Sequence, residues 1–411
     1  MIFEQKTNES FQILNFISNF ATKMAGLYIH IPFCRSRCIY CGFYSTTLLD
    51  MRQQYVDALC REMELRPQMA TPDALCEGLS TGVNTIYLGG GTPSQLTIPQ
   101  LEQLFHYINK VYAPSLHALS STLLPPPSSQ TEVTIEMNPD DVTVPYAEAL
   151  PRLGVNRVSM GAQTFNDQRL RFLHRRHSAH QVQQAVERLR AAGIHNISID
   201  LMYGFPGETL ADWQQDIDEV LRLQVEHISA YCLMIEEGTP LHRMGIEPCD
   251  EERERQMYEL LMDKLTAAGY EHYEISNFAR PGYRSRHNSS YWQDIPYIGL
   301  GAAAHSYDGQ RRSWNVADIQ AYIQAIAQGE LPSEHEVIDE CTHYNDRITV
   351  ALRTREGLPL DALPEKYRRY CLHEAQPFLE SGLLQWHDHH LSLTKKGLFV
   401  SDYVMSSLIY V

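Results

Sequence analysis

The sequence of 411 residues has no long hydrophobic run and little positive charge. No stretch of about 20 consecutive apolar residues occurs, so no helix is expected to cross a membrane. Lysine and arginine number 34 against 50 aspartates and glutamates, and the net charge of −16 argues against a broad nucleic-acid contact. Residues 1–25 lack the continuous apolar core of a secretory signal. These absences predict a cytoplasmic protein with no nucleic-acid partner.

Cysteine is also scarce, and most of it is scattered. Three cysteines, Cys34, Cys38 and Cys41, form a CxxxCxxC motif directly after the apolar run 27–31. A fourth cysteine is missing nearby, and so is the second CxxC or HxxxH pair that a structural zinc site usually has. The other six are expected to be buried or neutral thiols. They are Cys60, Cys76, Cys232, Cys249, Cys341 and Cys371.

Three thiolates at this spacing can bind three irons of a [4Fe–4S] cube, which in its closed form takes four cysteines. The fourth iron then keeps an open position, where it can bind a small molecule and pass it an electron. A zinc-stabilised binding module is the alternative that the cysteine spacing alone leaves open.

Short β-branched runs alternate with amphipathic segments, which predicts βα units around a parallel sheet. Six units would make an incomplete (β/α)6 barrel of the α/β class. Barrel enzymes carry their chemistry on the loops after the strands, where most of the motifs below also lie. The expected strands are 27–31, 84–88, 132–136, 156–160, 196–201 and 227–231. The expected helices include 55–66, 99–111, 179–191 and 210–223.

Four parts are expected along the chain. Residues 1–25 read as an N-terminal extension, with Met24 as an alternative start, and 26–249 as the partial barrel. Residues 250–318 would cover the barrel, and 319–411 would form a small winged-helix-like domain with a hairpin at 383–393. The proline- and serine-rich stretch 112–130 cannot form a packed element and is expected to be a disordered surface insertion.

Three motifs follow one another in a fixed order: YIHIPFCRSRCIYC at 28–41, GGGTPS at 89–94 and IEMNP at 135–139. Together they resemble the radical S-adenosylmethionine superfamily, and more narrowly the oxygen-independent coproporphyrinogen III oxidase group. The resemblance covers roughly residues 26 to 411. It implies a barrel of the radical SAM type with two cofactors, a [4Fe–4S] cluster bound by the three clustered cysteines and S-adenosylmethionine.

In this family, S-adenosylmethionine chelates the open iron and is cleaved to a 5′-deoxyadenosyl radical, while the protein supplies ligation and orientation. Glycines let the backbone approach such a ligand closely, although a tight turn explains a glycine triplet as well. A strand-end glutamate can accept hydrogen bonds from the cofactor or simply be solvated, and an arginine can be a surface charge. The resemblance implies that the following residues contact S-adenosylmethionine: Tyr28, Tyr40, Gly90, Gly91, Thr92, Glu136, Gln163, Arg175 and Asp200.

One departure indicates the branch of the family. The oxidases have a further cysteine two positions after the motif, where this chain has Phe43. The chain instead resembles the heme chaperone branch, and the HNSSYW motif at 287–292 matches that branch. The resemblance implies heme as a ligand, with His287 as its iron ligand and aromatic rings beside it. The alternative is a structural histidine over the core.

The expected function is therefore a heme chaperone that delivers heme to client proteins of respiration, such as a cytochrome or an oxidase, with no catalytic residues assigned. The client is open and includes transient contact with a membrane protein, and a homodimer is also open. The alternative is an oxygen-independent coproporphyrinogen III oxidase, which decarboxylates propionate side chains to give protoporphyrinogen IX. Phe43 and the HNSSYW motif favour the chaperone.

Overall fold

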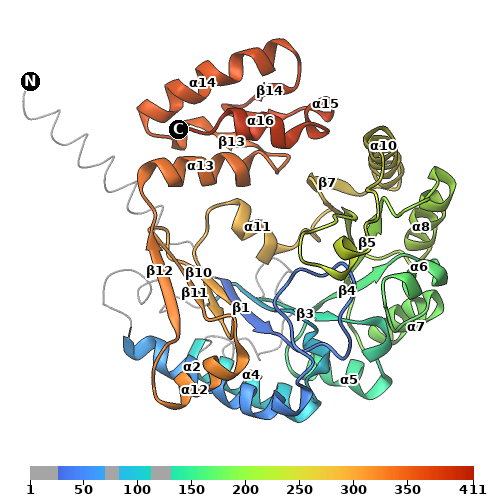
Figure 1. The fold of residues 1–411 in the computed structure, drawn as a ribbon, viewed down its shortest axis with the longest axis vertical. Coiled ribbons are helices and arrows are strands. Elements are labelled where there is room, and N and C mark those ends of the chain that lie inside the picture. The colour runs from blue at the N-terminus through green and yellow to red at the C-terminus, as the bar shows by residue number, and fades with distance from the viewer. Residues whose placement is uncertain (1–25, 70–82, 113–130) are drawn as a thin grey trace, which may run out of the picture.

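The computed structural model describes residues 26–69, 83–112 and 131–411 (Figure 1). The expected N-terminal extension lies outside the described residues, and so does the expected insertion apart from Tyr112. That residue ends helix α4 (Ile98–Tyr112) and is buried, so the helix continues to the position where the insertion was expected to begin.

Six parallel strands lie side by side in the order in which they occur along the chain. The neighbours of the two outer strands are β9 (Tyr297–Leu300) beside the first and β8 (Asn277–Ala279) beside the sixth, so the barrel stays open. The predicted α/β class and incomplete (β/α)6 barrel are confirmed. The six strands are β1 (Gly26–Ile31), β2 (Thr85–Gly90), β3 (Glu132–Met137), β4 (Arg157–Gln163), β5 (Asn196–Tyr203) and β6 (His227–Cys232).

Helices between the strands cover the outer face of this sheet (Figure 1). They include α2 (Arg52–Met69), α4, α5 (Val144–Arg152), α6 (Asp167–Phe172), α7 (Ala179–Ala191), α8 (Leu210–Arg222) and α10 (Glu251–Ala267). The sheet continues at its edges through β7 (Glu271–Glu274), β10 (His305–Tyr307), β11 (Arg311–Asn315) and β12 (Ser333–Val337). Among the helices of the described residues, none is long and apolar enough to cross a bilayer.

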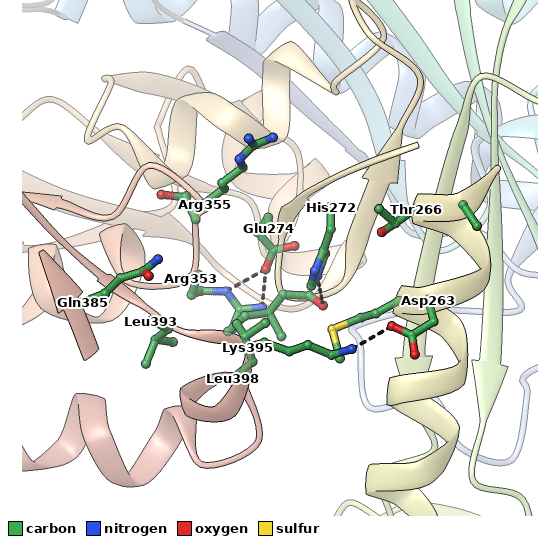
Figure 2. Close-up of a pocket in the computed structure, with 14 residues that line it drawn as sticks. Asp263, Thr266, His272, Glu274, Arg353, Arg355, Gln385, Leu393, Lys395 and Leu398 are labelled. Atoms are coloured by element: carbon green, nitrogen blue, oxygen red, sulfur yellow. Dashed lines mark hydrogen bonds and ion pairs between the residues drawn. The ribbon is translucent and has the colours of Figure 1, made fainter. Parts of the chain in front are cut away.

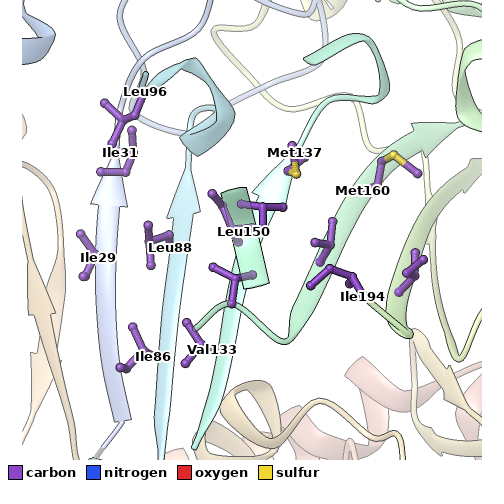
Figure 3. Close-up of a cluster of buried hydrophobic side chains, with 14 of the residues drawn as sticks. Ile29, Ile31, Ile86, Leu88, Leu96, Val133, Met137, Leu150, Met160 and Ile194 are labelled. Atoms are coloured by element: carbon purple, nitrogen blue, oxygen red, sulfur yellow. The ribbon is translucent and has the colours of Figure 1, made fainter. Parts of the chain in front are cut away.

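The strands alternate between apolar and polar side chains, because successive residues of a strand point to opposite faces. The apolar set packs against the helices, and Ile29, Leu88 and Val133 belong to the same core as Leu150 of α5 (Figure 3). The polar set of the same strands faces the inside of the barrel. A fully packed barrel would have apolar side chains on both faces, so the polar interior marks the space where a ligand can be held.

The last segment packs around a core of its own, which includes Ile348, Tyr367 and Leu391. A short antiparallel sheet in the order β13-β15-β14 lies beside its helices, and the helix and hairpin pattern matches the predicted winged-helix-like domain. We call this segment the C-terminal module. Its elements are α13 (Glu340–Ala351), β13 (Leu358–Pro359), α14 (Glu365–Glu380), β14 (Leu384–His387), β15 (His390–Leu393), α15 (Lys395–Leu398) and α16 (Ser401–Ser407).

Two further helices join the module to the barrel. Helix α11 (Arg286–Trp292) lies between α13 and the barrel and contacts both α13 and β2 (Figure 1). Helix α12 (Ile319–Ala327) packs on α2, and its residue Tyr322 belongs to the barrel core. The four-part division of the chain stays a prediction. Helix α12 begins at the expected boundary, residue 319, and so falls in the expected C-terminal part, but it packs on the barrel.

The Glu62 carboxylate on α2 is fully buried and joins four segments. It accepts hydrogen bonds from the Gly301 backbone N–H at 2.8 Å, the Tyr322 hydroxyl at 2.7 Å and the Asn315 amide at 2.8 Å. The Arg66 guanidinium, one turn along the same helix, pairs with it at 2.7 Å. Removal of one partner from a buried charged network leaves the others without compensation, which is costly.

We therefore expect Glu62→Ala to lower the free energy of unfolding by about 3–5 kcal/mol. Chemical denaturation followed by circular dichroism measures this loss. Glu64→Ala is the matched control, because Glu64 lies on the same helix in partly exposed ion pairs with Arg61 and Lys110. The control is expected to change stability by no more than about 1 kcal/mol. A loss for Glu62→Ala as small as that of the control would contradict the role of this network.

Candidate cofactor site

The three clustered cysteines lie in the loop that follows β1, at the carboxyl end of the parallel strands. The loop is closed on itself by a pair of backbone hydrogen bonds, from Thr46 N–H to the Pro32 carbonyl at 2.7 Å and from Cys34 N–H to the Thr46 carbonyl at 2.9 Å. Arg37 reinforces this closure by donating to the Ser45 carbonyl at 2.7 Å. These hydrogen bonds fix the conformation of the cysteine loop.

All three thiols are free and partly buried. Burial raises the pKa of the Cys34 and Cys41 thiols, so iron binding at this loop is coupled to proton release. Within the described ranges, no three His, Cys, Asp or Glu side chains gather as a single metal ion would need. In a cube each thiolate binds a different iron, and soft sulfur donors suit iron. The donor set therefore fits three irons of a [4Fe–4S] cluster.

Arg175 lies beside the cysteines, with its Nη1 3.6 Å from the Cys38 Sγ. Its Nη2 donates to the Asn138 side chain at 2.7 Å and to the Gly161 carbonyl at 2.6 Å. Its Nε is buried and has no hydrogen-bond partner, so one donor is left for an acceptor that the chain itself does not supply. The alternative of a surface helix charge is wrong for this residue.

The glycine triplet lets β2 end close to the cysteine loop. Gly90 has φ +110°, and a Cβ there would lie 2.5 Å from the His30 ring. A Cβ on Gly91 would lie 2.7 Å from the Pro32 carbonyl carbon. The next residue, Thr92, places its hydroxyl 3.5 Å from the Cys34 Sγ. Larger residues would push β2 away from the loop, and this close approach explains the triplet.

Glu136 sits inside the barrel at the end of β3. Its carboxylate accepts hydrogen bonds from the Tyr87 hydroxyl at 2.7 Å and from the Gly90 backbone N–H at 3.1 Å. Burial, with the nearby Asp200 carboxylate, raises the pKa of Glu136 to about 7. Burial also raises the pKa of Asp200, whose carboxylate is 3.4 Å from the Ser159 hydroxyl. Two partly buried carboxylates with raised pKa values are suited to a cationic or hydroxyl-bearing ligand.

Gln163 ends β4 with φ 67°, at an irregularity in its pairing with β5. A Cβ built on Gly161 would lie 2.6 Å from the Gln163 amide nitrogen and 3.2 Å from Arg175 Nη2, so both side chains pass over that glycine. Tyr40, in the cysteine loop, packs against a small cluster that includes Leu173 and Leu241. The structure thus brings the predicted Gln163, Arg175 and Tyr40 to the same end of the barrel as the cysteines.

Tyr28 points into the barrel and donates its hydroxyl proton to His30 Nδ1 at 3.0 Å. His30 was not predicted, although it follows Tyr28 by two positions and so shares its face of the strand. Its Nε2 is 3.1 Å from the Tyr44 carbonyl, and burial lowers its pKa to about 4. The neutral imidazole therefore connects the barrel interior to the far end of the cysteine loop.

Arg157 is a second residue that the sequence reasoning missed. It is 1% exposed on β4, and its Nε and Nη1 have no hydrogen-bond partner. It lies in register with Thr134, whose hydroxyl is also buried and unpaired. Its charge lowers the pKa of both Glu136 and Asp200, opposing the effect of their burial. Arg157 and Ser159 are two positions apart on β4 and so point to the same, inner face of the sheet. This spacing was the signal that could have identified Arg157.

His287 lies at the other end of the barrel, beside Thr85 at the start of β2. Its Nδ1 is 2.8 Å from the Thr85 hydroxyl and its Nε2 is 2.8 Å from the Tyr291 hydroxyl. The ring stacks on Tyr87 at 5.0 Å and is 2% exposed, and burial lowers its pKa to about 3. Both nitrogens are engaged and the ring is enclosed. The assignment of His287 as the heme iron ligand stays a prediction, with the structural histidine as its alternative.

The start of α11 explains why His287 is held there. The backbone N–H groups of Arg286 and His287 donate to the Glu132 carboxylate at 3.1 and 2.9 Å. A negative charge at a helix N-terminus satisfies the free donors of the first turn. The HNSSYW motif thus fastens α11 onto the strand starts, while the cysteine loop occupies the strand ends.

An open barrel of six parallel strands with a CxxxCxxC loop after its first strand defines a radical SAM protein. Residues 28–220 match the Radical SAM superfamily, and residues 338–400 match the HemN C-terminal domain. The solved structure of coproporphyrinogen III oxidase (HemN) from Escherichia coli has a TM-score of 0.77 and 21% sequence identity. The likeness covers 97% of this chain and 92% of that chain, and it is a likeness of fold.

Sequence relatives identify the branch of the radical SAM superfamily to which the chain belongs. The chain is 35% identical over 401 residues to the heme chaperone HemW of Bacillus subtilis, covering 94% of this chain and 99% of that protein. It is 33% identical over 395 residues to the HemW of Mycobacterium tuberculosis, covering 93% and 94% of the two chains. The chain belongs to the HemW family of heme chaperones within the radical SAM superfamily. This membership replaces the zinc-stabilised module as the interpretation of the cysteines.

We expect Cys38→Ala to abolish the iron–sulfur absorbance after anaerobic reconstitution, because two thiolates cannot hold a cube stably. Absorbance and iron content measure the loss. Cys341→Ala is the control, since Cys341 lies in the C-terminal module and contacts the Tyr410 carbonyl. A normal spectrum in the Cys38 variant would refute the ligand assignment.

The affinity for S-adenosylmethionine is expected to fall as the pH is lowered from about 8 to about 6. Glu136 has a pKa of about 7, so the acceptor is lost on the acid side of this range. The free energy of unfolding of the protein without the cofactor changes in the opposite direction. The raised pKa of Glu136 makes the folded state less stable as the pH rises from 4.5 toward 7, because the folded state binds the proton more tightly than the unfolded state. Calorimetric titration measures the affinity.

Glu136→Gln should flatten the profile over this range, and Glu187→Gln, at an exposed position of α7, should leave it unchanged. An undiminished pH dependence in Glu136→Gln would show that another group controls binding.

Proposed function

We propose that this protein is a heme chaperone that binds heme and delivers it to a client heme protein. The observation that carries the proposal is the alignment with proteins named heme chaperone HemW, at 35% identity over 94% of the chain. The alignment includes both the barrel and the C-terminal module, so it is not a likeness of the radical SAM segment alone.

In this proposal the three thiolates of the cysteine loop hold a [4Fe–4S] cluster, which when bound can supply an electron to S-adenosylmethionine. The chain's own residues bind and orient the cofactor. Glu136 and Asp200 offer partly buried acceptors, and Gly90 and Gly91 allow the backbone to come close. Arg175 keeps an unpaired donor, its Nε, beside the cysteines. Tyr28, Tyr40, Thr92 and Gln163 complete the proposed contacts.

Phe43 supports a chaperone rather than an oxidase. Its side chain is 74% exposed, at the position where the oxidase pattern has a further cysteine. A phenyl ring cannot ligate iron or take part in electron transfer as a thiol can. The second candidate function is coproporphyrinogen III oxidase, which is favoured by the fold likeness to HemN and by the match to its C-terminal domain.

The proposal extends to partners and location. We propose that the protein acts in the cytoplasm and that its client is a heme protein, including a membrane protein that it contacts transiently. The net charge of −16 supports a partner other than a nucleic acid. A homodimer is part of the same proposal.

The deciding experiment gives the anaerobically reconstituted protein two substrates. With heme, we expect saturable binding followed by transfer to the heme-free form of a b-type cytochrome. With coproporphyrinogen III, reductant and S-adenosylmethionine, we expect no protoporphyrinogen IX, as measured by chromatography. Conversion at many turnovers would establish the oxidase instead, and failure to bind heme would refute the chaperone.

A further inference from the structure

Two of the buried carboxylates in this protein pair directly with an arginine. Glu274 pairs with Arg353 at 2.6 Å, in the wall of a cavity of about 520 Å³ between the barrel and the C-terminal module (Figure 2). Glu62 pairs with Arg66 at 2.7 Å. Arg157 differs from both arginines. It is 1% exposed, its Nε and Nη1 have no hydrogen-bond partner, and no carboxylate of the described residues forms an ion pair with it.

The strand register places Arg157 on the inner face of the barrel together with two carboxylates. Arg157 and Ser159 are successive inward residues of β4. Ser159 is in register with Glu136 on β3, and its hydroxyl lies 3.4 Å from the Asp200 carboxylate on β5. The arginine therefore lies one inward position closer to the strand starts than the residue that connects the two acid groups.

The two carboxylates receive their hydrogen bonds from groups other than Arg157. Glu136 accepts from the Tyr87 hydroxyl at 2.7 Å and from the Gly90 N–H at 3.1 Å, and Asp200 lies beside the Ser159 hydroxyl. An ionised carboxylate has about four lone-pair positions, so both groups keep acceptor capacity. An arginine paired directly with them would occupy the remaining positions. The arrangement seen here leaves these positions open to a ligand.

The charge of Arg157 still acts on both carboxylates. Two acid groups that share one site repel each other, and one of them tends to stay protonated unless a cation is near. Burial, with the nearby Asp200, raises the pKa of Glu136 to about 7, and the charge of Arg157 opposes this rise. The same charge opposes the rise that burial causes in the pKa of Asp200. An unpaired guanidinium thus compensates negative charge without taking up acceptor oxygens.

The other titratable groups around the two carboxylates are neutral, apart from one cation. Arg175 acts on Asp200 from the strand ends, but it donates to Asn138 and to the Gly161 carbonyl and lies beside Cys38. Burial raises the pKa of the surrounding tyrosines and lowers the pKa of the surrounding histidines, so both kinds are uncharged at neutral pH. These neutral groups are Tyr28, Tyr87, His227, Tyr231, His287 and Tyr291.

We propose that Arg157 is a positioning residue of the S-adenosylmethionine site, whose unpaired charge holds Glu136 and Asp200 as ionised acceptors while their free oxygens stay available to the cofactor. The sulfonium and ammonium groups of S-adenosylmethionine are both stabilised by ionised carboxylates. The inference rests on the proposed contacts of Glu136 and Asp200 with the cofactor. It gives a role to a residue outside that set.

The first test uses the reconstituted protein without S-adenosylmethionine. Infrared difference spectra across neutral pH follow the C=O band of protonated carboxyl groups, and Glu136→Gln identifies the contribution of Glu136. In Arg157→Met this contribution is expected to titrate about one pH unit higher than in the wild type, since a neighbouring arginine lowers a carboxyl pKa by about 1–3 units. Arg157→Lys keeps the charge and should titrate close to the wild type. An unchanged titration in Arg157→Met overturns the proposal.

The second test is a calorimetric titration of the same proteins with S-adenosylmethionine at several pH values. Arg157→Met is expected to lose affinity about fivefold at pH 7, as a one-unit rise in the pKa of Glu136 predicts, and to recover it at alkaline pH. Arg188→Met is the matched control, because it removes the same charge from α7, where Arg188 donates to the Val142 carbonyl at 2.9 Å. The control should keep the wild-type profile.

The results distinguish this inference from the proposed function. If the wild type does not bind S-adenosylmethionine, the proposed cofactor contacts fail and the role of Arg157 fails with them. If the wild type binds the cofactor but Arg157→Met loses affinity equally at every pH, Arg157 has only a structural role. In that case the inference is overturned and the proposed cofactor contacts stand.

Discussion

The structure depends on one constraint, the alternation of side chains along six parallel strands that do not close into a full barrel. The outward set builds the core with the helices, and the inward set is polar. Buried polar groups need partners, and here they satisfy one another across neighbouring strands. Glu136 accepts from Tyr87 on the adjacent β2, and Asp200 lies near Ser159 on the adjacent β4. The groups left over, above all Arg157 and Arg175, are donors, so the interior still has hydrogen bonds to offer to a ligand.

Much of this architecture could be predicted from the sequence because its signals are local. The short β-branched runs and the amphipathic segments between them predicted the open barrel. One end of the cofactor site could be predicted from the cysteine spacing, the glycine triplet and the strand-end Glu136. His30 and Arg157 could not be selected in this way, because their importance depends on which strands become neighbours. A register relation such as that between Thr134 and Arg157 is a tertiary fact.

His287 illustrates the limit of reasoning from a motif. A histidine beside aromatic residues is chemically competent to bind heme, and nothing in the sequence says that both of its nitrogens are already engaged. Thr85, which binds one of them, lies 202 positions away along the chain. The Glu132 carboxylate that fixes the start of α11 is equally remote. The motif was therefore informative about the branch of the family, whereas the role of its first residue stays a prediction.

The C-terminal module and the barrel have separate hydrophobic cores that meet around a cavity. Polar contacts cross this junction, among them the ion pairs from Arg353 to Glu274 and from Lys395 to Asp263 and the backbone bond from Ile275 N–H to the Arg353 carbonyl. Two cores joined in this way need not unfold together, because each can lose its own packing first. A molecule that fills the cavity contacts both and stabilises them jointly, so occupancy makes their melting more cooperative. Whether the cavity is filled therefore affects how far the barrel and the C-terminal module unfold as one unit.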